Sequence, residues 1–154
     1  MMATSSHLHW DFTPTLTPDH IISQLNAYVE LHDRYPDAIV VDNLKDLADP
    51  NDGDEFRALE DATVWLKNLA METQIAAITL HHVGGFHEDG INPIPLSGLR
   101  GKIGKTPALA LTIHRPDNNE MRVSVVKHRD GVVDTSGLLF SRVKVDLGAM
   151  SFIG

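Results

Sequence analysis

The sequence of 154 residues contains no cysteine. This excludes a disulfide framework and a thiolate metal site. No apolar run approaches the roughly 20 residues of a membrane span, and Met1 to Ser6 do not form the apolar core of a signal peptide. We therefore expect a cytoplasmic protein with no membrane partner. Basic charge is also scarce, since 13 Lys and Arg against 21 Asp and Glu leave a net charge of −8. Any contact with nucleic acid must then come from a local basic patch.

A complete phosphate-binding loop is missing as well. Gly104-Lys105-Thr106 ends like one, but such a loop has four residues between its first glycine and its Gly-Lys pair. Here Gly98 leaves five residues and Gly101 leaves two. The loop should also open a helix, whereas a strand-like pattern follows at 108–114. We interpret 98–106 as a basic loop.

The clearest feature that is present is the apolar run Ala38–Val41, which leads directly into Asp42. Such a run predicts a strand buried on both faces. An unpaired buried carboxylate is too costly for a core, so Asp42 belongs at the C-terminal edge of a parallel sheet, where α/β proteins bind ligands. The alternative is that Asp42 only caps the next turn.

The surrounding pattern predicts a βαβ unit. A helix should begin at Thr17-Pro18, with a hydroxyl cap and proline in its first turn, and end before Pro36. Residues 43–54 suggest a solvated loop, and Asp52 with Glu55 has capping-box spacing for a second helix. That helix should face inward with Phe56, Leu59, Thr63, Leu66 and Ala70. A second buried strand, 75–80, then implies parallel pairing.

The later part of the chain changes character. A long loop rich in Gly, Pro and Asn runs from Val83 to Ser97, and long loops at such an edge are usually functional. Segments 108–114 and 121–127 then predict an antiparallel pair. Further short strands are expected at 138–140, 143–145 and 151–153, and another is possible at 7–12.

His81 and His82 follow the second strand, with His87, Glu88 and Asp89 nearby. Adjacent strand residues point to opposite faces, so the pair is poorly placed to share one metal ion. We expect one of them to face the cleft beside Asp42 and to bind an anion. A metal-dependent hydrolase built on Asp42, Asp46, His81 and His82 is a weaker alternative.

Lys127 and Arg129 form the third feature. Residues at i and i+2 of a strand point the same way, so these two cations lie together where the strand enters a glycine turn. They suit a phosphate on a ligand or on a neighbouring molecule. The alternative is a solvated strand end.

Together these elements resemble the second half of the RecA-like ATPase core of DnaB-family hexameric replicative helicases, including phage primase-helicases. The resemblance covers roughly residues 36–135 and lies in the order of its parts. These are a strand ending in Asp42, a helix with Leu66–Ala70 near its end, a strand ending at His82, a long loop, and Lys127-x-Arg129-x-Gly131.

The resemblance implies a role for each matching residue. Asp42 is similar to the Walker B acid that holds the water shell of Mg²⁺ at ATP, with Asn43 beside it in the nucleotide site. His82 matches the γ-phosphate sensor. Lys127 and Arg129 match fingers that act on the ATP of an adjacent subunit. The loop 84–106 would face single-stranded DNA with Arg100, Lys102 and Lys105.

The resemblance also implies a homo-oligomer, a hexamer in the family, working in a bacterial host or phage-infected cell. The family's phosphate-binding loop lies before this region, and none of the 37 residues that precede Ala38 spells it. We therefore expect residues 1–154 to form a single partial RecA-like α/β domain that lacks its P-loop half. Alone, it should neither bind ATP tightly nor hydrolyse it without a P-loop-bearing partner. A non-catalytic module that binds DNA or a helicase is the alternative.

Overall fold

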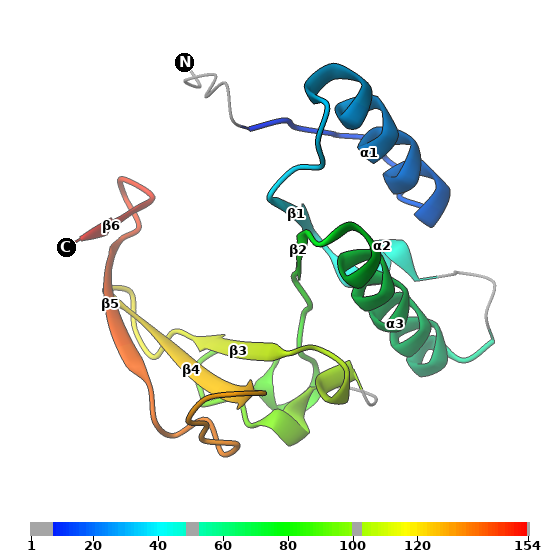
Figure 1. Ribbon diagram of the computed structural model, residues 1–154. Coiled ribbons are helices and arrows are strands. Elements are labelled where there is room, and N and C mark those ends of the chain that lie inside the picture. Colours follow the sequence, from blue (N-terminus) through cyan, green and yellow to red (C-terminus); the bar gives the residue numbers. More distant parts are fainter. Residues whose placement is uncertain (1–7, 49–52, 100–102, 154) are drawn as a thin grey trace.

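A parallel pair of strands and an antiparallel sheet of four strands make up the two halves of the fold (Figure 1). The computed structural model describes residues 8–48, 53–99 and 103–153. Strands β1 (Ala38–Val41) and β2 (Ala76–Thr79) pair in parallel, and helix α3 (Glu55–Thr73) connects them. The predicted βαβ unit is therefore confirmed.

Helix α1 (Pro18–His32) begins and ends where the sequence predicts. The Thr17 side chain accepts a hydrogen bond from the backbone N–H of His20, and Pro18 occupies the first turn. The helix ends at Asp33, which adopts the left-handed conformation with φ of 55°. Ile21 and Leu25 turn the helix toward the core.

Two details of the next segment differ from the prediction. Residues 44–47 form a short helix, α2 (Leu44–Leu47), in place of a solvated loop, because Leu44 and Leu47 lie one turn apart and are both buried. Helix α3 is capped by Asp54, which accepts from the N–H groups of Phe56 and Arg57. The expected cap, Asp52, lies outside the described residues.

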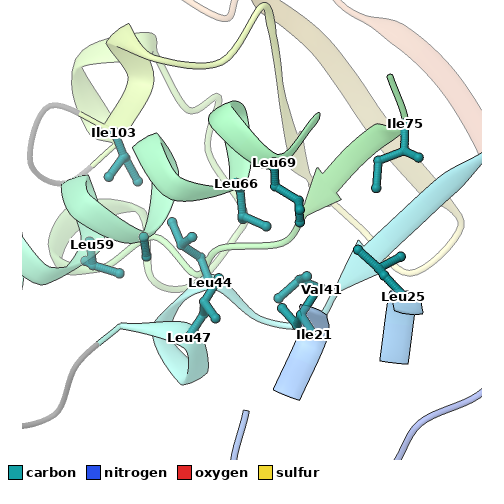
Figure 2. Close-up of a cluster of buried hydrophobic side chains, with 11 residues drawn as sticks. Ile21, Leu25, Val41, Leu44, Leu47, Leu59, Leu66, Leu69, Ile75 and Ile103 are labelled. Atoms are coloured by element: carbon teal, nitrogen blue, oxygen red, sulfur yellow. The ribbon is translucent and has the colours of Figure 1, made fainter. Parts of the chain in front are cut away.

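The core gathers between α1, the two parallel strands, α2 and α3 (Figure 2). Leu59, Thr63 and Leu66 of α3 point into it as expected. Phe56 does not, since it is half exposed in the first turn of α3, where the helix extends beyond the strands (Figure 1). The central cluster comprises Ile21, Leu25, Val41, Leu44, Leu47, Leu59, Ala62, Leu66, Leu69, Ile75 and Ile103.

The parallel strands are buried on one face only, so the prediction of burial on both faces is wrong. Val41 is 5% exposed, but its neighbour Val40 is 64% exposed and Ile78, its partner across the pair, is 51% exposed. The physical reason is that α1, α2 and α3 all pack into the one cluster that contains Val41. No described element covers the face that carries Val40 and Ile78.

The antiparallel sheet has the order β3 (Leu109–His114), β4 (Glu120–His128), β5 (Ser141–Asp146) and β6 (Ser151–Ile153). This confirms the predicted pair and the strands at 143–145 and 151–153. Residues 138–140 are not a strand, because the Asp134 carboxylate holds the backbone of this segment in a turn by accepting from the N–H groups of Ser136 and Leu139.

Residues 8–12 are extended but form no strand. His9 packs edge-on against Tyr28 of α1, and Asp11 pairs with His20. These contacts bind the segment to a helix, which offers no backbone ladder. Among the described residues, no helix is both long and apolar enough to cross a membrane.

Candidate nucleotide and nucleic-acid site

Asp42 and His82 lie at the same edge of the parallel pair, as predicted. The backbone pairing continues past the strands, since the N–H of Leu80 donates to the carbonyl of Val41 (3.1 Å) and the N–H of Leu44 donates to the carbonyl of Leu80 (2.8 Å). Asp42 lies between the two residues that bind Leu80, and His82 lies two residues beyond it. The fold thus brings the carboxylate and the imidazole to one edge.

The side chains of Asp42 and His82 are both exposed. Neither makes a hydrogen bond or an ion pair with the rest of the described chain. The next helix is capped by Asn43, whose side chain accepts from the N–H of Lys45 at 2.9 Å, so the interpretation of Asp42 as a mere cap is wrong.

This edge fits a magnesium ion held through water. A single free carboxylate, with phosphate oxygens supplying the remaining charge, is the usual protein contribution to a Mg²⁺–nucleotide complex. Asp42 provides that carboxylate. The same edge does not fit a zinc centre, because the described residues contain no group of three metal-binding side chains, and Asp46 is used to close the capping box of α2.

Asn43 has a structural task that the sequence did not reveal. Its side-chain oxygen caps α2, and its own backbone N–H donates to the Asp46 carboxylate at 3.3 Å. The capping box holds the backbone directly after Asp42. Asn43 therefore fixes the direction in which the chain leaves the candidate site.

The long loop after β2 is held against the antiparallel sheet. The Thr112 hydroxyl donates to the carbonyl of Ile94 at 2.9 Å, and the N–H of Leu96 donates to the carbonyl of Thr135 at 2.9 Å. Gly137 has φ of 72°, and a Cβ there would lie 2.5 Å from the carbonyl oxygen of Ile94. The loop is thus pinned at its centre to the sheet.

Of the three cations predicted to face DNA, Lys105 is described and exposed, at the end of the 3₁₀ turn η3 (Ile103–Lys105). Arg100 and Lys102 lie outside the described residues.

Lys127 and Arg129 lie together at the end of β4, as expected. The ammonium group of Lys127 donates to the carbonyl of Lys105, and the backbone N–H of Arg129 donates to the carbonyl of Ala108 at 2.9 Å. Burial, and then the positive charge of Arg129, lowers the pKa of Lys127. No hydrogen bond or ion pair within the described ranges joins either cation to Asp42 or His82.

The sequence interpretation missed His114, which the structure buries beneath β4. It is 1% exposed, and both ring nitrogens lack a hydrogen-bond partner among the described residues. Its ring meets Phe140 edge-on at 5.7 Å, while the Arg122 guanidinium stacks over the same Phe140 ring at 4.4 Å. Burial, and then the charge of Arg122, lowers the pKa of His114.

The alternation along β3 was the available signal for this burial. Thr112 and His114 share one face of the strand and are both buried, whereas Leu111 and Ile113 lie on the other face and are about half exposed. The polar residues therefore point inward, which reverses the usual pattern.

Comparisons with known proteins agree with this architecture. The chain is 36% identical over 153 residues to the gene 65 protein of Mycobacterium phage L5, covering 96% of this chain and 54% of the phage protein. It is 37% identical over 153 residues to the gene 65 protein of Mycobacterium phage D29, covering 96% of this chain and 63% of that protein. The chain thus spans between half and two thirds of these relatives. No protein-family model matches the sequence.

Two solved structures share the fold. The ATPase domain of one DnaB-like helicase superposes with a TM-score of 0.70 at 19% identity, over 88% of this chain and 50% of that one. A second DnaB-like replicative helicase, solved in a study of its interactions with primase, superposes with a TM-score of 0.72 at 19% identity, over 88% of this chain and 35% of that one. The chain therefore has the fold of part of a DnaB-like helicase ATPase domain, as its sequence predicted.

Proposed function

We propose that this chain is the second part of a RecA-like ATPase core that acts on single-stranded DNA, as in DnaB-like replicative helicases. The observation that carries the proposal is the free Asp42 carboxylate, which lies at the same strand edge as His82. In this function Asp42 orients the water shell of Mg²⁺ at ATP. His82 contacts the γ-phosphate, and Asn43 fixes the chain between the two strands.

Lys127 and Arg129 act in trans on the ATP of an adjacent subunit in a homo-oligomer. Their place at the end of β4, without a described contact to Asp42, supports this assignment. Cations that meet charge developing on a transferring phosphoryl group are worth about 10³–10⁵ in rate. Single-stranded DNA lies along the loop 84–106, with Arg100, Lys102 and Lys105 against its phosphates.

Hydrolysis requires a P-loop-bearing segment, because nothing in this sequence spells the backbone cradle for the phosphates. Two uncovered apolar faces support docking of such a segment. One carries Val40 and Ile78 on the parallel strands, and the other carries Leu111 and Ile113 on β3. Exposed apolar faces of this kind usually mark protein–protein contacts.

The test is reconstitution of ATP hydrolysis. The chain is mixed with the part of the phage L5 gene 65 protein that lies outside the matched residues, and ATPase activity is measured with Mg²⁺ and an oligothymidylate. We expect hydrolysis that neither component shows alone and that DNA stimulates. Asp42→Asn should abolish it, and Arg129→Ala should lower kcat by about 10³-fold or more.

Arg34→Ala is the matched control for Arg129→Ala, since Arg34 is exposed and forms only a surface ion pair with Asp37. Equal activity of the wild type and Arg129→Ala would refute the finger assignment. Association and DNA binding without any hydrolysis would instead favour the second candidate, a non-catalytic module that binds DNA or a helicase.

A further inference from the structure

The short segment from Ile103 to Ala108 touches both halves of the molecule. Ile103 is 6% exposed and belongs to the core cluster, where Figure 2 shows it beside helix α3. Gly104 is also buried, and a Cβ on it would come within 3.0 Å of the Leu96 side chain. One end of this segment is therefore anchored in the core of the parallel half.

The other end of the segment binds the two cations of β4. The carbonyl of Lys105 accepts from the ammonium group of Lys127, and three residues later the carbonyl of Ala108 accepts from the backbone N–H of Arg129. Lys127 is half-buried, and a half-buried ammonium group that loses an acceptor must find another one. A shift of this segment will therefore change the position of Lys127.

Lys105 thus has two outward connections. Its side chain is exposed and is the last cation of the basic loop, while its backbone carbonyl faces inward to Lys127. A polyanion bound by the side chain pulls on the same residue that holds the Lys127 ammonium group. Lys127 in turn has no other hydrogen bond from its ammonium group among the described residues.

We propose that the backbone carbonyl of Lys105 positions the ammonium group of Lys127, and that single-stranded DNA bound by the Lys105 side chain moves this carbonyl and reorients Lys127. The inference rests on the proposed function, because it takes the loop 84–106 as the DNA-binding element. It adds a direct link of one residue between the DNA-binding loop and a cation at the end of β4. The Lys105 carbonyl acts as a positioning group and contacts no substrate itself.

The experiment follows the side-chain ammonium and Cε signals of Lys127 by NMR in the full chain, during titration with an oligothymidylate. We expect the Lys127 signals to shift as DNA binds, with the same midpoint as the binding curve. Lys67, exposed on the outer face of α3, should not shift and serves as the internal control.

The Lys105→Ala variant separates the two parts of Lys105, because it removes the ammonium group and keeps the carbonyl. Before DNA is added, the Lys127 signals should stay close to those of the wild type. The slope of log K against log salt concentration should fall by about 0.7, the value of one phosphate contact on a single strand. The DNA-induced shift of Lys127 should disappear or shrink severalfold. Lys67→Ala should leave both the slope and the shift unchanged.

Each outcome decides the matter. DNA binding without any movement of the Lys127 signals overturns the inference and leaves the proposed DNA-binding role intact. An unchanged slope and an unchanged Lys127 shift in Lys105→Ala also overturn it, since another contact would then move Lys127. If the chain does not bind the oligothymidylate at all, the proposed role of the loop fails and the inference fails with it.

Discussion

Val40 and Val41 are neighbours on β1, yet they should respond very differently to the same substitution. Val41 is 5% exposed within the main core, and Val40 is 64% exposed on the uncovered face. Val41→Ala removes two buried methyl groups, worth about 0.8 kcal/mol each, and leaves a cavity. We expect it to lower the free energy of unfolding by about 2–3 kcal/mol.

Val40→Ala should cost no more than about 0.5 kcal/mol, as is usual for exposed positions. Urea denaturation followed by circular dichroism, at two protein concentrations, measures both variants against the wild type. Equal losses would refute the reasoning, because the face of Val40 would then be covered in the isolated chain. A loss at Val40 that grows with protein concentration would show that a second copy covers this face. In the reconstituted ATPase, Val40→Asp should weaken association with the P-loop-bearing segment far more than Val40→Ala does.

Two further predictions concern the antiparallel half. The fold should lose stability as the pH falls below about 6.5, because the unfolded chain takes up a proton that the lowered pKa of buried His114 resists; this residue can contribute at most about 1.4 kcal/mol per pH unit. His114→Leu should remove that part of the pH dependence in denaturation curves, whereas His82→Ala, at an exposed position, should keep it. Gly137→Ala should destabilise by about 2 kcal/mol or more, since its φ is 72° and the new Cβ would meet the Ile94 carbonyl. Gly90→Ala, with φ of 66° but no atom within 4 Å, should cost only the backbone term of about 1 kcal/mol, and equal effects of the two glycine variants in urea denaturation would contradict the clash.

The candidate site shows what sequence patterns can and cannot predict. Asp42 and His82 were placed correctly because each follows an apolar run of strand length, and parallel strands end at a common edge. Lys127 and Arg129 were paired correctly from their spacing. Lys105 was assigned only a charge, because a backbone carbonyl leaves no trace in a sequence, and its contact with Lys127 joins residues 22 positions apart.

The errors in the fold share one physical origin. The run Ala38–Val41 is apolar at every position, so its composition suits burial on both faces. The helices of this chain pack on one face only, and the residues of the other face remain exposed. Phe56 has the right helical spacing for the core, but α3 extends past the strands before the spacing can bury it.

The sequence by itself determined the βαβ unit, the antiparallel strands, the edge that carries Asp42 and His82, and the resemblance to DnaB-like ATPase domains, because these depend on local periodicity and order. Only the tertiary structure decided which faces are covered, that His114 lies buried under a stacked arginine, and that the carbonyl of Lys105 holds Lys127. Burial and backbone contacts of that kind depend on which surfaces meet in space, and residues far apart in the chain settle them together.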